Sequence, residues 1–461
     1  RVLSEERKVS RRRYLKYAGG VAVVVAVATT GYVLYEATKP PPTPPAKKTL
    51  RFWHTCSAAE SSLLKEQIAD YERDHPSVEF QVNLVLVTAG VVREIPYEER
   101  AAKLVARVQE SEHGSPPDLY LGDAPMQFKI GKLGKAVELD DYLKGWDGLV
   151  DIPKWMWNAC SYKDKIIAIP QDFFVPVIFY NKDLFTKAGV EKFPDTWDEL
   201  LETCKRLNNP EKGEYAVGWA WTEDAAYWST QAFLLSNGGG IYKDGKVILN
   251  SPESVEAVEF VVELAKYSAP DMSAWKYEDW DRAFTSGKLA IQLGNGSWNI
   301  SNYREIAPKL NYGIAPYPKA TRTSRTLVPG HRVRFYMPLK RFLELGEKFP
   351  LETYISEGVE FVKYFLNKEQ QLRWCKALEY VPVRSSVLED PFFDQPLYDA
   401  FKYERENAYA EFTGDIAAIY GPIVESFAGA YQAILVRKEP VKEALDKATA
   451  EIEETIRASN V

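Results

Sequence analysis

Trp298 is the side chain whose setting most strongly predicts contact with a small molecule. Residues 287–298 indicate a strand followed by a loop that contains Gly294 and Gly296, and glycine lets a backbone approach a ligand closely. The indole of Trp298 follows this loop directly. Its flat apolar face can stack on the face of a sugar ring. Loop and ring together favour the binding of a carbohydrate.

Further candidates stand at the ends of predicted strands. Trp53 and His54 end a strand over 49–54, and Asp123 ends another over 117–123. Ligands of open α/β sheets bind outside the carboxyl ends of strands, so these side chains are expected near a ligand. Two alternatives stay open: Asp123 as the cap of a following helix, and His54 as a histidine with structural hydrogen bonds. The other candidates, chosen for ring faces or hydrogen-bonding groups although such rings are also normal in cores, are Asp172, Trp221, Tyr227, Trp228 and His331.

The sequence contains no motif for metal-dependent or covalent catalysis. It has neither an H-E-x-x-H run nor a nucleophile elbow, and its four cysteines form no C-x-x-C pair. The cysteines allow one disulfide or four buried thiols. The glycine run 238–240 lacks the G-K-[ST] ending of a phosphate-binding loop and follows a predicted helix rather than a strand. No metal ion or cofactor is therefore predicted.

Length and charge indicate an acidic globular body with a basic leader. A chain of 461 residues is long for one core, which favours two lobes. Residues 1–48 hold ten Lys or Arg against three Glu, so the rest of the chain is strongly acidic within a net charge of −7. An acidic body argues against nucleic acid as a partner.

The N-terminal 48 residues predict export. Residues 10–16, SRRRYLK, match the pattern of twin-arginine export signals, and residues 17–35 are uncharged and long enough to span a bilayer. The linker over 36–48 is rich in proline and predicts an extended spacer. Both a cleaved signal and a retained anchor agree with this pattern.

Residues 166–200 predict the place where the chain passes from one sheet to another. Two apolar runs, 166–169 and 173–180, are interrupted by Pro170 and Pro176, and proline is excluded from the middle of a central strand. A strand that leaves one sheet, bends and enters a second explains this arrangement. Asn181 then caps a short helix, and Thr196 with Glu199 predicts a capping box at the start of the next.

The same stretch resembles the family-1 extracellular solute-binding proteins of ABC importers, the maltodextrin-binding type. The resemblance lies in an IP strand end at 169–170, YNKDLF at 180–185, AG at 188–189 and P-x-TWDEL at 194–200. Weaker matches follow at 284–298 (F-x-x-G-K-x-A, then G-x-W), at 313–318 (GIAPYP) and at 380–384 (YVPVR, where the family carries a nearby glycine).

This resemblance implies an α/β fold of the type II periplasmic-binding-protein kind, with two hinged lobes around a ligand cleft. The expected lobes are 49–172 with 311–370, and 173–310 with 371–461, after an n-region at 1–16, a signal or anchor helix at 17–35 and a linker at 36–48. The resemblance implies a monomer that captures a sugar, expected to be an oligosaccharide, outside the cell and delivers it to the permease of an ABC transporter.

Two other functions remain open at this stage. An exported carbohydrate-active enzyme would use paired carboxylates, but acidic residues are too frequent for any pair to stand out. The same fold could instead bind a peptide, a polyamine, a metal or a phosphorylated compound, and an anionic ligand would need convergent cations. Arg322, Arg325, Arg332 and Arg334 form such a group in sequence, although a solvated surface turn is the favoured explanation for them.

Overall fold

The computed structural model describes residues 47–84, 87–88, 91–92, 105–106, 117–221, 223–320, 326–330, 333–340 and 349–461. Residues Lys48–Val461 form one compact unit. The expected n-region, the expected helix at 17–35 and nearly all of the linker lie outside the described residues, as do His331, Arg322, Arg325 and Arg332. Within the described ranges, no helix is long and apolar enough to cross a membrane.

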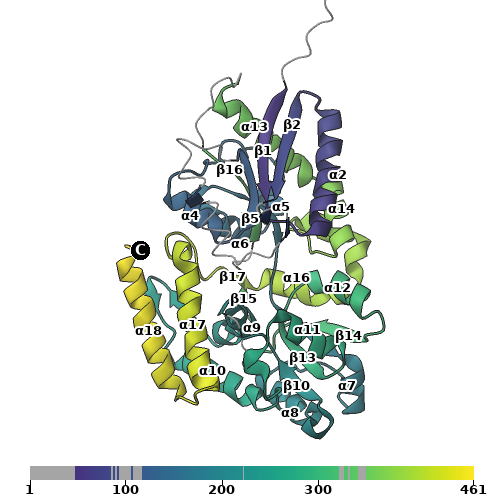
Figure 1. Ribbon diagram of the computed structural model, residues 1–461, viewed down its shortest axis with the longest axis vertical. Coiled ribbons are helices and arrows are strands. Elements are labelled where there is room, and N and C mark those ends of the chain that lie inside the picture. Colours follow the sequence, from purple (N-terminus) through teal and green to yellow (C-terminus); the bar gives the residue numbers. More distant parts are fainter. Residues whose placement is uncertain are drawn as a thin grey trace, which may run out of the picture. The chain divides into compact units, whose positions relative to one another are not determined.

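The first of two main sheets has five strands and is mixed (Figure 1). In spatial order its strands are β2 (Val78–Leu84), β1 (Lys48–His54), β5 (Leu119–Asp123), β16 (Val333–Pro338) and β8 (Ile169–Phe173). Strand β1 runs parallel to β2 and β5, whereas β16 is antiparallel to both of its neighbours. The carboxyl ends of β1 and β5 therefore lie side by side. We call this end of the strands, where β1 and β5 finish, the edge of the first sheet.

The described chain opens with a βαβ unit. Helix α2 (Ala58–Asp74) joins the parallel strands β1 and β2 and begins with a complete capping box between Ser57 and Glu60. Its buried face, which includes Leu64 and Tyr71, faces the core. The helix thus fixes the position of Glu60 at its first turn, next to the edge where β1 ends.

The second main sheet has four strands, in the order β10 (Tyr215–Gly218), β13 (Leu289–Asn295), β9 (Val177–Asn181) and β14 (Tyr312–Ala315). Strands β10 and β13 are parallel, and β9 is antiparallel to both β13 and β14. Strand β8 belongs to the first sheet and β9 to the second, so the chain crosses between sheets over residues 174–176. The crossing expected at Pro176 is confirmed.

The expected return to the first lobe at residue 311 is wrong. Strand β14 pairs with β9 along four residues and is an outermost strand of the second sheet. The chain re-enters the first sheet only at β16. The expected boundary at 371 is also misplaced, since Gln370 and Arg373 of one helix, α14 (Lys368–Leu378), both bond to α2.

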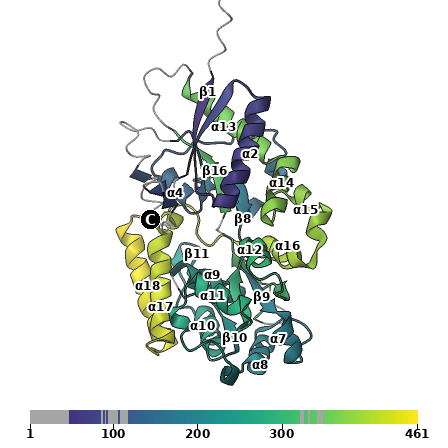
Figure 2. The ribbon, with the colours of Figure 1, turned by 45° about the vertical axis from the view of Figure 1, so that its right-hand side comes forward.

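Helices cover both sheets. The helices that contact the first sheet or α2 are α6 (Lys154–Ala159), α13 (Leu351–Phe365) and α14. Three short helices belong to the same parts of the chain: α4 (Met126–Lys132) follows β5, α5 (Gly148–Asp151) precedes α6, and α15 (Ser385–Leu388) follows α14. Those that contact the second sheet are α7 (Lys182–Lys187), α8 (Trp197–Leu207), α9 (Glu223–Ser236), α10 (Pro252–Ala265), α11 (Tyr277–Thr285) and α16 (Asp399–Glu406). Helix α12 (Trp298–Ile306) follows β13 directly. Figures 1 and 2 both show α17 (Tyr420–Leu435) and α18 (Val441–Ala458) side by side.

Short two-stranded ladders complete the described fold. They are β3 (Val87–Thr88) with β4 (Val91–Val92), β6 (Ser161–Tyr162) with β7 (Lys165–Ile166), β11 (Tyr242–Lys243) with β12 (Lys246–Val247), and β15 (Val328–Pro329) with β17 (Ala408–Tyr409).

Local predictions from capping residues hold with one exception. Asn181 caps α7 through two backbone N–H groups, and Thr196 accepts the N–H of Glu199 at the start of α8. The carboxylate of Glu199 instead accepts the N–H of Asp195, so the predicted reciprocal box is one residue out of register. All four cysteines are free and buried.

Candidate functional site

Three charged residues lie in one row across the first sheet, at the edge where β1 and β5 end. Arg334 of β16 is paired in register with Asp123 of β5 on one side and with Asp172 of β8 on the other. The hydroxyl of Thr55, just after β1, donates to the Asp123 carboxylate at 3.3 Å. The strand ends predicted to face a ligand are thus gathered at one edge.

The guanidinium of Arg334 is buried and bonded to two carboxylates. Its Nε and Nη2 donate to Asp172 at 2.9 and 2.7 Å, and its Nη1 donates to Glu60 at 2.7 Å. The hydroxyl of Tyr380 donates to the same Glu60 oxygen at 2.8 Å. One cation therefore serves two buried anions, and we call these four residues the Arg334 cluster.

The two carboxyls share one cation, but their pKa values shift in opposite directions. Burial raises the pKa of Asp172 to about 6, although Arg334 opposes this rise. Burial also acts against the charge of Glu60, but Arg334 and the N–H of Ser57 outweigh it and lower the pKa of Glu60. The explanation of Arg334 as part of a solvated surface turn is wrong, because only 6% of this residue is exposed.

Two candidates from the first sheet take structural positions. His54 is buried, and its Nδ1 accepts the N–H of Cys56 at 3.3 Å. Burial, with help from Lys65 and Arg334, lowers the pKa of His54 to about 4, so the ring is neutral at physiological pH. Asp172 is fully buried by its pairing with Arg334. Trp53 and Asp123 remain half-buried at the sheet edge.

Trp298 stands at the equivalent place in the second sheet. It starts α12 directly after the carboxyl end of β13, and it is half-buried. A Cβ built on Gly296 would lie 1.9 Å from the indole, so the ring rests directly on the backbone of this glycine. Gly294 has a φ of +75° and packs against Ser229 of α9, where an added Cβ would lie 2.4 Å from the Ser229 hydroxyl. The glycines expected to admit a ligand instead admit the indole and α9.

Phe174 joins the indole to the Arg334 cluster. It lies in the crossing between β8 and β9, and its ring meets Trp298 edge-on with centroids 5.3 Å apart. The same ring meets Tyr380 at 5.5 Å, and the Arg334 guanidinium lies 5.8 Å from its centroid. Trp228 of α9 lies 6.4 Å from Trp298. Phe174, Trp228, Trp298 and Tyr380 form one group of rings at the point where the chain changes sheets, which we call the crossing rings.

The remaining aromatic candidates are core residues. Trp221 stacks on Trp219, with centroids 5.9 Å apart, and is nearly buried. Tyr227 is fully buried and donates to Glu411 at 2.9 Å. Trp228 is fully buried too, although it touches Trp298. Trp298 is the candidate of the second sheet that keeps an exposed surface.

Glu411 explains the glycine run at 238–240. Its carboxylate accepts the backbone N–H groups of Ile241 and Tyr242 just after this run, as well as Gln231 at 2.8 Å. The anion held by this loop is therefore the chain's own carboxylate, in agreement with the rejection of a phosphate loop.

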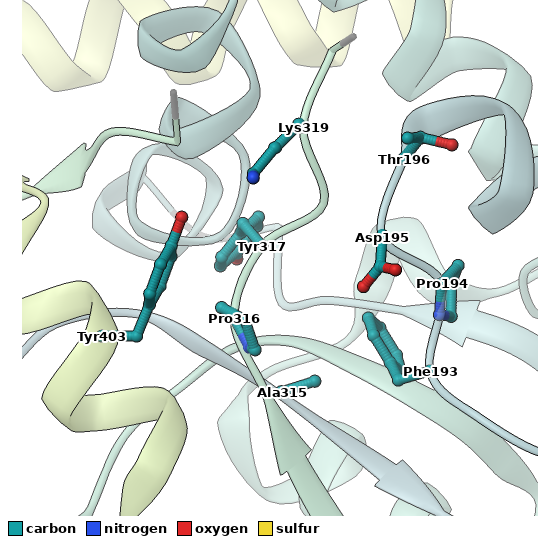
Figure 3. Close-up of a pocket in the computed structure, with 9 residues that line it drawn as sticks. All are labelled: Phe193, Pro194, Asp195, Thr196, Ala315, Pro316, Tyr317, Lys319 and Tyr403. Carbon is teal, nitrogen blue, oxygen red and sulfur yellow. The ribbon is translucent and has the colours of Figure 1, made fainter. Parts of the chain in front are cut away.

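A separate cavity of about 460 Å³ lies beside the second sheet (Figure 3). Its walls come from the start of α8, the residues after β14, and Tyr403 of α16: Phe193, Pro194, Asp195, Thr196, Ala315, Pro316, Tyr317, Lys319 and Tyr403. None of the predicted site residues lines it. The backbone of Lys319 bonds to Asp195 and Trp197, which holds the two walls together.

Within the described residues, no group of His, Cys, Asp and Glu side chains could hold a metal ion. The candidate site, as far as it is described, contains rings and one charge cluster, which can stack on a ligand and form hydrogen bonds with it.

Comparison with known proteins identifies the family. The family model described as "Bacterial extracellular solute-binding protein" matches residues 83–398, more than half of the chain. The chain belongs to this family. The matched region includes β8, the crossing, β9, Trp298, Arg334 and Tyr380, whereas Trp53, His54 and Glu60 precede it.

Relatives of this solute-binding protein fall into two groups by name. A maltotriose-binding protein of Pyrococcus abyssi is 26% identical over 366 residues, covering 77% of this chain and 71% of the relative. The sn-glycerol-3-phosphate-binding periplasmic protein UgpB of Rhizobium meliloti is 24% identical over 428 residues, covering 87% and 92%.

Solved structures confirm the mixed α/β fold of the solute-binding protein. The cyclic alpha-maltosyl-1,6-maltose binding protein of Arthrobacter globiformis aligns with a TM-score of 0.74 at 20% identity, covering 90% of this chain and all of that one. UgpB of Mycobacterium tuberculosis, in complex with glycerophosphocholine, aligns with a TM-score of 0.73 at 18% identity, covering 90% and 100%.

The prediction missed Phe174, Tyr380, Glu60 and Arg334 as parts of the site. Phe174 carried a signal, because it lies within the predicted crossing. Tyr380 follows Glu379, which ends α14 with a left-handed φ of 59°, the conformation that the family's glycine would favour. Glu379 thus forms the turn near which the family carries glycine.

Glu404 of α16 offers a test of buried charge in this solute-binding protein. It is fully buried, its Oε1 accepts the N–H of Tyr317 at 2.8 Å, and its Oε2 has no hydrogen-bond partner among the described residues. Burial raises the pKa of Glu404 to about 8. The folded state therefore holds this proton up to a higher pH than the unfolded chain does, and stability is lost as pH rises through 8.

Glu404→Gln is expected to remove this loss. Relative to the parent protein, the free energy of unfolding of the variant should increase by up to about 1.4 kcal/mol per pH unit between pH 5 and 8. Denaturant unfolding at several pH values measures it, with the exposed Glu425→Gln as control. Parallel pH profiles for all three proteins would contradict a buried, proton-holding Glu404.

Proposed function

We propose that this protein captures a sugar outside the cell and delivers it to the permease of an ABC importer. The observation that carries the proposal is the group of crossing rings, in which the partly exposed indole of Trp298 meets Phe174 at the joint between two sheets. An aromatic face beside hydrogen-bonding groups suits a molecule with both C–H faces and hydroxyls. Maltotriose and maltosyl-maltose in the names of relatives support an oligosaccharide.

The proposed motion is closure of two hinged lobes, one around each main sheet. The chain passes between the sheets over residues 174–176, a short connection of the kind that acts as a hinge. The crossing rings would then lie in the cleft, and Trp53 and Asp123 at the first sheet's edge would face Trp298 across it. The alternative of an exported enzyme has less support, because the named relatives are binding proteins.

The proposal also covers the oligomeric state and the location of the protein. The protein would act as a monomer at the outer face of the membrane, held by the 17–35 segment or released after its cleavage. It would need neither nucleic acid nor cofactor.

The second candidate ligand is a glycerol phosphate, favoured by the UgpB relatives. A phosphate group calls for a cation with free donors. The guanidinium of Arg334 faces the crossing rings, but it is already bonded to Glu60 and Asp172. Two carboxylates around one cation leave this edge negative or neutral, which favours an uncharged ligand over a phosphate.

Calorimetric titration separates the candidates. We expect the fragment 48–461 to bind maltotriose or a longer maltodextrin, and to bind sn-glycerol-3-phosphate and glycerophosphocholine at least tenfold more weakly, a difference of about 1.4 kcal/mol. Melting-temperature shifts from the same ligands give a second measurement. Preference for the phosphate compounds would reverse the assignment, and release of a cleaved sugar would indicate an enzyme.

Gly296→Ala should weaken sugar binding without unfolding the protein. The added Cβ would overlap the Trp298 indole at 1.9 Å, so the ring must leave its position. Overpacking of this kind costs about 1–3 kcal/mol, and we expect an affinity loss of about tenfold. Gly429→Ala is the control, because a Cβ there meets nothing within 4 Å. Equal affinities of the two variants would show that the ring position is unimportant for binding.

A further inference from the structure

A network of mostly buried polar side chains adjoins the loop that carries Trp298. It joins Asp281 of α11, Gln292 and Asn295 of β13, and Asn299 and Tyr303 of α12. The carboxylate of Asp281 accepts Gln292 Nε2 at 2.9 Å, Asn299 Nδ2 at 3.0 Å and the hydroxyl of Tyr303. These bonds link three elements around one acceptor.

Asn295 connects this network to the loop that carries the indole. Its Nδ2 donates to Gln292 at 2.6 Å, and its Oδ1 accepts Asn299 Nδ2 at 3.0 Å. The same Oδ1 accepts the backbone N–H of Gly296 at 2.7 Å. Gly296 is the residue on which the Trp298 ring rests. The path from the half-buried Asp281 carboxylate to the indole therefore runs through Gln292 or Asn299, then Asn295 and one glycine backbone.

Stability alone does not account for this arrangement. Asp281 is surrounded by neutral donors, and burial raises the pKa of its carboxyl despite three hydrogen bonds. Buried polar networks can be replaced by apolar packing at little cost, whereas a fully satisfied network defines one geometry. Asn295 is 0% exposed and makes hydrogen bonds through both Oδ1 and Nδ2. The network is suited to holding a loop in one conformation.

We propose that Asn295 and Asp281 are positioning residues for ligand recognition, which act by fixing the Gly296 backbone and with it the Trp298 indole. This inference rests on the proposed function for its consequence in binding. Neither residue touches the ligand. Their effect on affinity passes through the ring.

The first experiment needs no ligand. The protein is labelled with 5-fluorotryptophan, and the ¹⁹F resonance of Trp298 is assigned with Trp298→Phe. Asn295→Ala should shift or broaden this resonance and leave that of Trp146 in place. Asn250→Ala, which removes another amide bonded to a carboxylate, Asp446, is the matched control. Asp281→Asn keeps the side-chain shape and should move the same resonance by less. An unmoved Trp298 resonance in both network variants overturns the inference.

The second experiment is a double-mutant cycle with maltotriose as the probe. Asn295→Ala should raise the Kd about tenfold in the parent protein and leave it unchanged in a Trp298→Ala background. An equal rise in both backgrounds would mean that Asn295 acts on the whole structure, and it would overturn the inference. Absence of maltotriose binding to the parent protein would count against the proposed function alone, since the ¹⁹F result stands independently.

Discussion

Trp298→Ala should reduce the affinity for the sugar by at least about 30-fold. A partly exposed ring at the centre of an aromatic group has the character of a binding hot spot, and truncation of such residues costs about 2 kcal/mol or more. Phe174 and Trp228 would lose the ring they share, since their centroids lie 5.3 and 6.4 Å from that of the indole. The loss should be found in the dissociation constant from calorimetry and not in the melting temperature alone.

The control is another half-buried tryptophan. Trp146 packs edge-on against Trp157, with ring centroids 6.3 Å apart, and is not one of the crossing rings. Trp146→Ala removes the same side chain and should leave the affinity within about twofold of the parent protein, since it removes no contact to the ligand. If Trp298→Ala retained the parent affinity, the ligand would have to bind outside the crossing rings, and the cavity at Tyr403 would become the next place to examine.

The crossing could be predicted because its determinants are local. Pro176 stands between β8 and β9, and proline cannot donate to a sheet ladder, so this break follows from the sequence. Pro170, expected to end a strand, instead lies within β8, which is an edge strand and so tolerates proline. Helix caps at Asn181 and Thr196 depend on residues within one turn, and these too are where the sequence indicates them. Another local determinant is Pro153, which separates α5 from α6.

The charge cluster could not be predicted because its members are distant in sequence. Arg334 is 162 positions from Asp172 and 274 from Glu60, and nothing local distinguishes it from the arginines around it. Its burial depends on the register of β16 between β5 and β8. The same reason applies to Tyr227, whose hydroxyl is used by Glu411, 184 positions away. The sequence indicates aromatic and charged side chains as candidates, but the order and register of the strands determine which residues they contact.

Arg334→Met should destabilise the fold strongly. It would leave Glu60 and Asp172 buried without their cation, and breaking a buried ion pair in this way costs about 3–5 kcal/mol. Arg373 provides the matched control, because it also bonds to two carboxylates, Asp70 and Glu66, both at 2.7 Å, but its side chain is 36% exposed. Arg373→Met should cost no more than about 1 kcal/mol. Denaturant unfolding of both variants measures the difference.

The pH dependence identifies the cause. Without Arg334, the pKa of Asp172, already raised to about 6 by burial, should rise further, as should that of Glu60. Carboxyls with raised pKa values stabilise the folded state below their unfolded pKa and lose this contribution as pH rises through the folded value. Arg334→Met should therefore recover part of its stability between pH 8 and pH 5, and adding Asp172→Leu should recover part of it at pH 8 by removing one unpaired charge. A deficit that stays constant with pH would mean that Arg334 contributes through packing against Phe174 and Tyr380 rather than through its charge.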